Sequence, residues 1–274
     1  MPVEVPFNQT EINEREKRIE QSLAKFKDLL ATRFNQEELS KINTALNLML
    51  EIHLPQKDRA DGKPFIQHPL EVASKVIEIG DKLTPDLVIS ALLHDSIEDM
   101  PEVIFAKRAN KKFPNHNYKL TINEYLKKNY LQIFRDWSFR EIDQEYGSRV
   151  SYYLDNLTNH DFDSLTEELP GLSLEEKNAL KNGLYADHVK DIIKDPDLCL
   201  LKYADFSSNI DLSSLAPESE KYLKLKRKYA SVILIFIDQL KKIERNHQLF
   251  DRKEMIIADL KNVYEQQYKS SSNV

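Results

Sequence analysis

One histidine and three acids lie within six residues of this chain, in the segment His94-Asp95-Ser96-Ile97-Glu98-Asp99. If the segment is helical, His94 and Glu98 lie one turn apart, as do Asp95 and Asp99, and the four form one patch. Burying an imidazole together with three carboxylates is costly unless a cation neutralises them. The pattern therefore indicates a divalent metal site. The alternative is a solvated helix end at which His94 merely favours the helix dipole.

Two other polar segments lie elsewhere in the chain. His68 stands at a junction between a loop and a helix, in Arg59-Ala60-Asp61-Gly62-Lys63-Pro64-Phe65-Ile66-Gln67-His68-Pro69, where an imidazole can point into a cleft. Asp205 and Asn209 share one face of an otherwise apolar helical stretch. Taken singly, His68 fits a cap or surface residue and Asp205 fits an ion pair with Lys202. The three segments therefore have to be interpreted together.

Helical periodicity dominates the rest of the chain and predicts an all-α fold. The 274 residues contain 41% hydrophobic and 31% charged residues but only 5 Gly, which is typical of a helical protein with a hydrophobic core. A buried central helix is expected over 85–99, because Thr84 can cap it and its apolar residues lie on all sides. Further helices are expected over 12–34, 36–53, 68–79, 142–157, 174–193, 197–212, 217–243 and 251–268.

We expect a single domain over 1–274, since no stretch resembles a linker between domains. Its core is expected over about 37–243, with a segment over about 101–141 inserted after the central helix and a C-terminal helix and tail over 244–274. An insertion beside a catalytic helix would be suited to act as a lid, a specificity loop or a partner surface.

Charge and composition exclude some classes of function. The net charge of −6 argues against sequence-independent binding to nucleic acid, which relies on a basic face. No apolar run approaches the roughly 20 residues that cross a bilayer, and the first residues lack a signal peptide, so a cytoplasmic protein without membrane contact is expected. The single cysteine, Cys199, lies in an apolar stretch and is expected to be a buried, inert thiol.

The ordered set of segments resembles the hydrolase domain of the RelA/SpoT family and its stand-alone relatives, the small alarmone hydrolases. The family pattern Arg-x-x-Gly-x-Pro-Tyr-Ile-x-His-Pro is matched over 59–69, with Phe65 in place of Tyr. Ala-Leu-Leu-His-Asp-x-x-Glu-Asp is matched over 91–99, and Lys-x-Ala-Asp-x-x-x-Asn over 202–209. Residues 146–150 and 157–158 are similar to the family's Phe-Gly-x-x-Val and Val-Thr stretch.

The resemblance implies an HD-type helical bundle that hydrolyses the 3′-pyrophosphate of (p)ppGpp-like nucleotides, giving pyrophosphate and GDP or GTP. It implies catalytic roles for Glu98 and Asp99 and a divalent metal, with manganese preferred over zinc or iron for a mixed N/O site. The implied metal ligands are His68, His94, Asp95 and Asp205.

Four residues are expected to bind the nucleotide. Arg59 would stack on the purine, for which a planar guanidinium is suited. The other three are Lys63 and Asn209, as contacts to phosphate and ribose, and Tyr229, which would help to close the pocket.

The chain also departs from the family. Phe206-Ser207-Ser208 replaces Arg-Leu-His beside the presumed ligand Asp205, which puts the substrate preference in question. Residues 100–145 are longer than the corresponding family segment. With no room for a synthetase domain, the chain is expected to degrade alarmones and not to make them.

Two other classes of function remain open at this point. One is an HD-type phosphohydrolase acting on another nucleotide or on a phosphorylated cofactor. The other is an antitoxin or a non-catalytic binding module. The sequence also leaves open a homo-oligomer or a toxin partner.

Overall fold

The computed structural model describes residues 9–59, 62–112, 124–159, 166, 169–213 and 215–269. Regular structure in these ranges is helical and contains no strand, so the predicted all-α fold is confirmed. A connected hydrophobic core runs from Ile19 to Tyr268. None of the described helices is both long enough and apolar enough to cross a membrane. The chain ends 1–8 and 270–274, which include most of the expected tail, lie outside the described residues.

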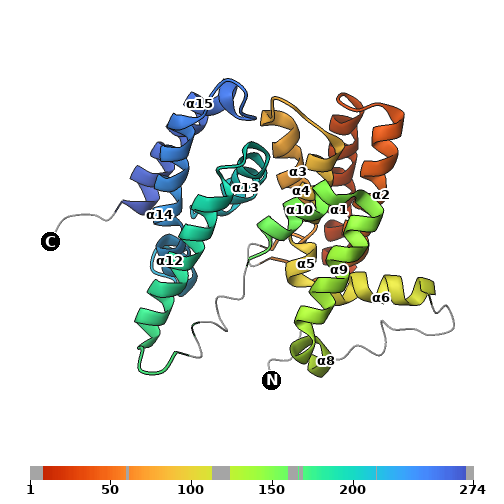
Figure 1. Ribbon diagram of the computed structural model, residues 1–274, viewed down its shortest axis with the longest axis horizontal. Helices are drawn as coiled ribbons and strands as arrows, with labels where there is room; N and C mark the ends of the chain where they lie inside the picture. Colours follow the sequence, from red (N-terminus) through yellow and green to blue (C-terminus); the bar gives the residue numbers. More distant parts are fainter. Residues whose placement is uncertain are drawn as a thin grey trace.

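The first group of helices comprises α1 (Gln9–Ala31), α2 (Gln36–His53), α3 (Gln67–Ile79) and α4 (Pro85–Leu93), which lie together in Figure 1. Asn35 and Glu38 form a reciprocal capping box at the start of α2, and the Thr84 side chain caps α4. All residues from Leu87 to Leu93 are buried, which confirms the expected buried central helix. α4 therefore fixes the position of whatever follows Leu93.

The central helix is not continuous to Asp99, and this part of the prediction is wrong. α4 ends at Leu93, and a short helix, α5 (Ser96–Asp99), begins after a turn in which Asp95 has ψ −9°. The sequence has neither Gly nor Pro at this turn, so periodicity alone predicts continuity. Neighbouring side chains of a regular helix point about 100° apart. His94 and Asp95 nevertheless reach the same group of side chains, since Asp95 contacts the imidazoles of both His94 and His68.

The expected insertion contains α6 (Pro101–Lys112), α8 (Glu124–Asn129) and most of α9 (Leu131–Tyr146). Its residues 113–123 lie outside the described part of the chain, and the domain boundaries stay a prediction. The single helix expected over 142–157 is divided at Gly147, where α10 (Ser148–Leu157) begins. Gly147 has φ +96° and ψ 163°, a conformation essentially restricted to glycine.

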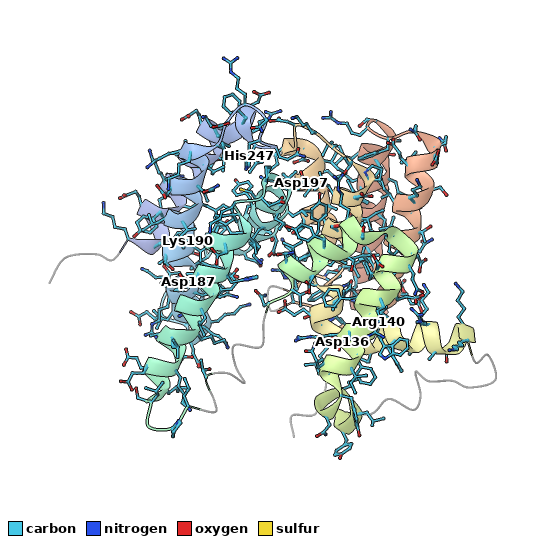
Figure 2. The ribbon with its side chains drawn as sticks, in the orientation of Figure 1. Asp136, Arg140, Asp187, Lys190, Asp197 and His247 are labelled. Atoms are coloured by element: carbon cyan, nitrogen blue, oxygen red, sulfur yellow. The ribbon has the colours of Figure 1, made fainter. Side chains whose placement is uncertain are left out.

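The second group consists of α12 (Leu174–Ile192) and α14 (Glu220–Lys242), and α13 (Pro196–Asn209) lies between the two groups. η1 (Phe250–Arg252), α15 (Lys253–Val263) and the π-helical turn η2 (Tyr264–Tyr268) follow. Asp197, near His247 in Figure 2, accepts a hydrogen bond of 2.6 Å from Gln248. The Tyr268 hydroxyl donates to the carbonyl of Ile210 at 2.9 Å. The C-terminal helices are thus fastened to both ends of α13.

Gly147→Ala should lower the free energy of unfolding by about 1–3 kcal/mol, because alanine at this φ is strained although its Cβ meets no atom within 4 Å. Gly183→Ala is the matched control. Gly183 lies within α12 with equally open space, so this change should raise stability by roughly 0.5–1 kcal/mol. Urea unfolding followed by circular dichroism measures both. Equal effects of the same sign would contradict the assigned backbone conformation.

Candidate metal centre

Three side chains from three distant helices converge at the end of the buried helix. His68 comes from the first turn of α3, His94 directly follows α4, and Asp205 comes from α13. The two imidazole Nε2 atoms are 3.1 Å apart. Asp205 Oδ1 lies 3.4 Å from His68 Nε2 and 3.7 Å from His94 Nε2. One ligand atom from each residue therefore lies within 4.8 Å of the others, as a shared metal ion requires.

Asp95 contacts the same pair of imidazoles from one side. Its Oδ1 lies 3.2 Å from His94 Nε2, and its Oδ2 lies 3.5 Å from His68 Nε2. The compact set within 4.8 Å comprises His68, His94 and Asp205, and Asp95 adjoins it. All four residues predicted from the sequence as ligands are therefore brought together.

Both imidazoles are oriented by hydrogen bonds on the ring nitrogen that faces away from the cluster. His94 Nδ1 lies 2.9 Å from the carbonyl of Ala91, to which it can only donate. Ser208 Oγ donates to the carbonyl of Asp205 and lies 3.2 Å from His68 Nδ1, so it accepts from that nitrogen. In the neutral tautomers both Nε2 lone pairs then face the cluster, which is the state that binds a metal. Ser208 thus has an orienting role that the sequence did not indicate.

The carboxylates strongly affect the titration of His94. Burial lowers the pKa of this imidazole, but the charges of Asp95 and Asp205 outweigh burial and raise it to about 9. Burial raises the pKa of Asp95, yet His94 and His68 lower it to about 2. Without a cation, the cluster therefore holds a proton on His94 at neutral pH. A divalent cation would take the place of that proton.

The positive charge of Lys202 balances the negative charge of Asp205. Its ammonium is buried and lies 3.2 Å from Asp205 Oδ2. Burial raises the pKa of Asp205, but the charge of Lys202 and the hydrogen bond to His68 hold it well below its usual value. One oxygen of Asp205 is thus occupied by Lys202, and the other, Oδ1, faces the imidazoles.

The donor set fits a divalent metal. The two imidazoles are each 5% exposed and are grouped with two carboxylates that remain ionised. A mixed N/O set of this kind is suited to manganese, iron or zinc. His68, His94 and Asp205 would hold the ion, with Asp95 beside them.

The predicted catalytic acids adjoin the cluster on α5. Glu98 is held by Asn159, whose backbone N–H and side-chain Nδ2 donate to Oε2 at 3.1 and 2.9 Å. Asp99 is exposed and accepts a long hydrogen bond of 3.5 Å from Gln56. Desolvation and the charges of Asp95 and Glu98 raise the pKa of Asp99 to about 7. Asp99 can therefore give or take a proton near neutral pH.

The predicted nucleotide contacts are found in different environments. Arg59 donates to Asn209 Oδ1 at 3.4 Å, and Asn209 Nδ2 donates to Asp205 Oδ1 at 2.9 Å, so both adjoin the cluster. Lys63 is exposed, with its Nζ 3.8 Å from Glu71 Oε1. Tyr229 is buried, with its ring 5.5 Å from that of Phe206. Tyr229 therefore packs in an aromatic part of the core, and its role in closing a nucleotide pocket stays a prediction.

Several residues of the site were missed from the sequence. His53 is buried, stacks on Phe65 at 5.0 Å, and its Nε2 lies 3.1 Å from Ser96 Oγ, so it supports the turn after Asp95. Asn159 holds Glu98 from a distance of 61 residues in the chain. Neither forms a recognisable short pattern, because each acts through a contact between distant segments.

A cleft of about 650 Å³ adjoins Glu98 and was also missed. Its lining residues belong mainly to α9, α12 and α14. Its lining includes five basic side chains and two acidic ones, so a polyanion would be attracted to it. The charged residues are Arg135, Lys181, Lys224, Arg227, Lys228, Glu98 and Glu220.

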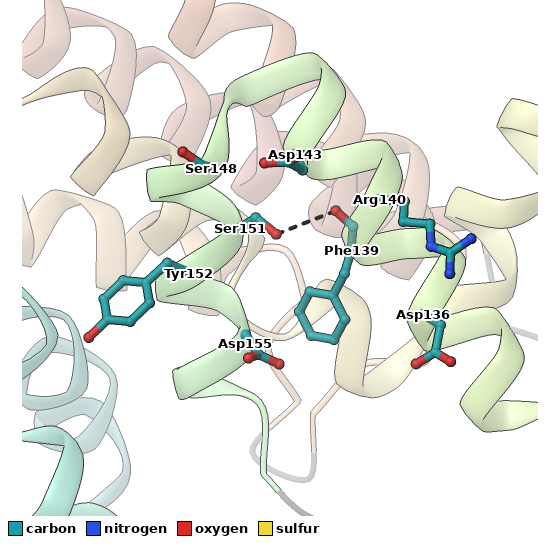
Figure 3. A pocket seen from close by; sticks show the side chains of 8 residues that line it. All are labelled: Asp136, Phe139, Arg140, Asp143, Ser148, Ser151, Tyr152 and Asp155. Carbon is teal, nitrogen blue, oxygen red and sulfur yellow. Dashed lines mark hydrogen bonds between the residues drawn. The ribbon is translucent and has the colours of Figure 1, made fainter.

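A second hollow, of about 490 Å³, lies between α9 and α10 and is shown in Figure 3. It is lined by three aspartates, Asp136, Asp143 and Asp155, and the Ser151 hydroxyl donates to the carbonyl of Phe139 across it at 3.4 Å. It contains none of the predicted site residues and no imidazole. The metal cluster on α3, α4 and α13 is therefore the better candidate site.

The fold is an all-α helical bundle with a candidate metal centre at the end of the buried helix. A scan against models of known protein families finds no match. Among curated proteins, similarity is found to RelA/SpoT-type proteins, which confirms the resemblance expected from the motifs.

Three of these relatives illustrate the extent of the similarity. A putative chloroplastic GTP diphosphokinase of rice (Oryza sativa subsp. japonica) is 41% identical over 75 residues, 27% of this chain and 8% of the rice protein. The guanosine-3′,5′-bis(diphosphate) 3′-pyrophosphohydrolase of Aquifex aeolicus is 41% identical over 63 residues, 23% of this chain and 9% of its own. The bifunctional (p)ppGpp synthase/hydrolase SpoT of Escherichia coli is 34% identical over 73 residues, 27% of this chain and 10% of its own. The match thus spans about a tenth or less of each relative.

Asp95→Asn should weaken binding of Mn²⁺ at least about tenfold, because an amide keeps the shape of the side chain but removes its negative charge. Asp187→Asn, on the exposed side of α12, is the matched control and should bind the ion as the unchanged protein does. Isothermal titration calorimetry measures both affinities. Equal affinity in the two variants would remove Asp95 from the metal centre.

Proposed function

We propose that this chain is a manganese-dependent hydrolase that removes the 3′-pyrophosphate of (p)ppGpp-like nucleotides and gives GDP or GTP and pyrophosphate. The observation that carries the proposal is the convergence of His68, His94 and Asp205, with Asp95 beside them, from three segments in the order of the family motifs. The proposal includes a nucleotide substrate met in the cytoplasm.

A divalent cation held by this cluster would supply the acidity that lets water attack phosphorus near neutral pH. Glu98, fixed by its two hydrogen bonds from Asn159, orients the attacking water and accepts its proton. The bond between the ribose 3′ oxygen and phosphorus breaks. Asp99, whose pKa is raised to about 7, donates a proton to the departing 3′ oxygen. Glu98 thus accepts the proton of the attacking water, and Asp99 supplies the proton to the leaving oxygen.

The nucleoside is oriented by groups on the other side of the cluster. Arg59 is linked through Asn209 to Asp205, so a purine stacked on its guanidinium lies at a fixed distance from the metal centre. Asn209 is placed to contact the ribose. Lys63 is exposed on the same loop as Arg59 and contributes to phosphate binding.

A second candidate is hydrolysis of another nucleotide or of a phosphorylated cofactor by the same centre. The observation in its favour is Phe206, which stands where the family has Arg. Its side chain is 1% exposed and stacks on Phe236 at 4.9 Å, so no cation from this position reaches the site. Substrate recognition beside Asp205 therefore differs from that implied by the family pattern.

Incubation with ppGpp and Mn²⁺ should release pyrophosphate and GDP, resolved by ion-exchange chromatography. Parallel reactions with pppGpp and ppApp measure the purine preference. Reactions with NADPH and dNTPs test the second candidate function. Turnover of NADPH or a dNTP alone would replace the first candidate by the second. No turnover of any of them by metal-loaded protein would contradict both.

Glu98→Gln should leave Mn²⁺ bound but lower kcat by about 10²–10⁴-fold, because the amide cannot accept the proton of water. Glu175→Gln, in the exposed first turn of α12, is the control and should keep full activity. Steady-state kinetics on ppGpp, with metal content measured on the same samples, provide the test. A normal kcat would remove Glu98 from the mechanism.

Arg59→Ala should chiefly raise KM for ppGpp, because the stacking surface for the purine is lost while Glu98 and Asp99 are untouched. Arg33→Ala, at an exposed position after α1, is the control. If KM is unchanged and kcat falls instead, Arg59 acts on the reacting groups and not on the purine.

A further inference from the structure

One wall of the cleft beside Glu98 is supplied by α9, within the segment expected to be an insertion. Leu131 and Arg135 of α9 line the cleft, and they lie one helical turn apart on the same face. Most of the other lining residues come from α12 and α14. Whatever occupies the cleft therefore contacts both the helical core and this additional helix.

α9 is firmly placed, so Arg135 is not on a loose surface segment. Phe134, Ser138 and Ile142 are buried along the same side of the helix, next to Leu131 and Arg135. The Ser138 hydroxyl donates to the carbonyl of Pro101 at 2.9 Å, and the helix packs on α5, α6 and α10. The guanidinium is thus presented to the cleft from a fixed position relative to Glu98.

Arg135 differs from the other arginines of the same segment. Arg108 pairs with Glu141 and lies 5.3 Å from the centroid of the Trp137 ring, and Arg140 lies 5.4 Å from that ring on the outer side of α9. The Nε atom of Arg135 is buried, and no described group accepts a hydrogen bond from it. A buried guanidinium donor without an acceptor is unfavourable, and an anion in the cleft would satisfy it.

The lining residues from α12 and α14 favour the same kind of ligand. Lys228 is half-buried, with its ammonium 4.3 Å from the centroid of the Tyr185 ring, and Arg227 and Lys224 line the cleft beside it. Among its charged groups the basic ones outnumber Glu98 and Glu220. A phosphate held between Arg135 and these residues would lie next to Glu98, the proposed proton acceptor.

We propose that Arg135 is a phosphate-binding, specificity-determining residue through which the additional helix α9 takes part in substrate recognition. The nucleotide as the source of the phosphate rests on the proposed function. Two groups share the required chemistry, the scissile 3′-pyrophosphate and the 5′-polyphosphate. A guanidinium can bind either in a bidentate manner.

The test compares Arg135→Met, Arg135→Lys and Arg140→Met in metal-loaded protein. Pyrophosphate and GDP are used as the probes, each titrated by calorimetry and each tested as an inhibitor of ppGpp hydrolysis. Arg135→Met should weaken one of the two probes by roughly tenfold to a hundredfold, since it removes charge-assisted hydrogen bonds. Loss confined to pyrophosphate assigns the 3′ group, and loss confined to GDP assigns the 5′ group. Arg135→Lys should retain part of the affinity, and Arg140→Met should retain all of it.

Thermal unfolding separates binding from stability, because Arg135→Met removes a donor without a partner and should not lower Tm. If both probes bind within twofold of the unchanged protein, or if the unchanged protein binds neither, the inference is wrong. If binding depends on Arg135 but ppGpp is not hydrolysed, the inference holds and the proposed function fails. If ppGpp is hydrolysed and Arg135→Met changes the affinity for neither probe, the proposed function holds and the inference is wrong.

Discussion

The structure depends on the burial of two imidazoles and two carboxylates in one small volume at the end of an apolar helix. Such a group is stable only if its charges are neutralised locally. The chain achieves part of this with Lys202 on Asp205 and with a proton on His94, whose pKa is raised to about 9 by the neighbouring carboxylates. His94 and Asp95, at the turn between α4 and α5, supply two consecutive members of this group.

α13 connects this cluster to the rest of the molecule. It carries Asp205 and Ser208, which reach the imidazoles, and Asn209, which reaches Arg59. It also packs on helices of both groups, so the metal centre lies where the two groups meet. The basic cleft lies at the same junction, on the far side of Glu98, with α9 as one wall. α13 thus helps to hold the cluster, and α9 helps to form the cleft that would bind a charged ligand.

Features set by short-range pattern were predictable from the sequence, and those set by packing were not. The bounds of α2, the Thr84 cap and the burial of α4 follow from local signals and were confirmed. The ordered motifs led to the four clustered residues without a structure. The turn at His94 carries no Gly or Pro, and the burial of Tyr229 depends on Phe206 and Tyr185 from other segments. Asn159, His53 and Arg135 act across long sequence separations, and no local spacing indicates them.

The most direct test of the central claim is a crystal structure of the protein grown with Mn²⁺ and recorded at the manganese absorption edge. The account predicts one strong anomalous peak between about 2.0 and 2.5 Å from Nε2 of His68, Nε2 of His94 and Oδ1 of Asp205. A peak at the aspartates between α9 and α10 alone, or no peak at all with the cluster intact, would contradict the assignment of this site as the metal centre.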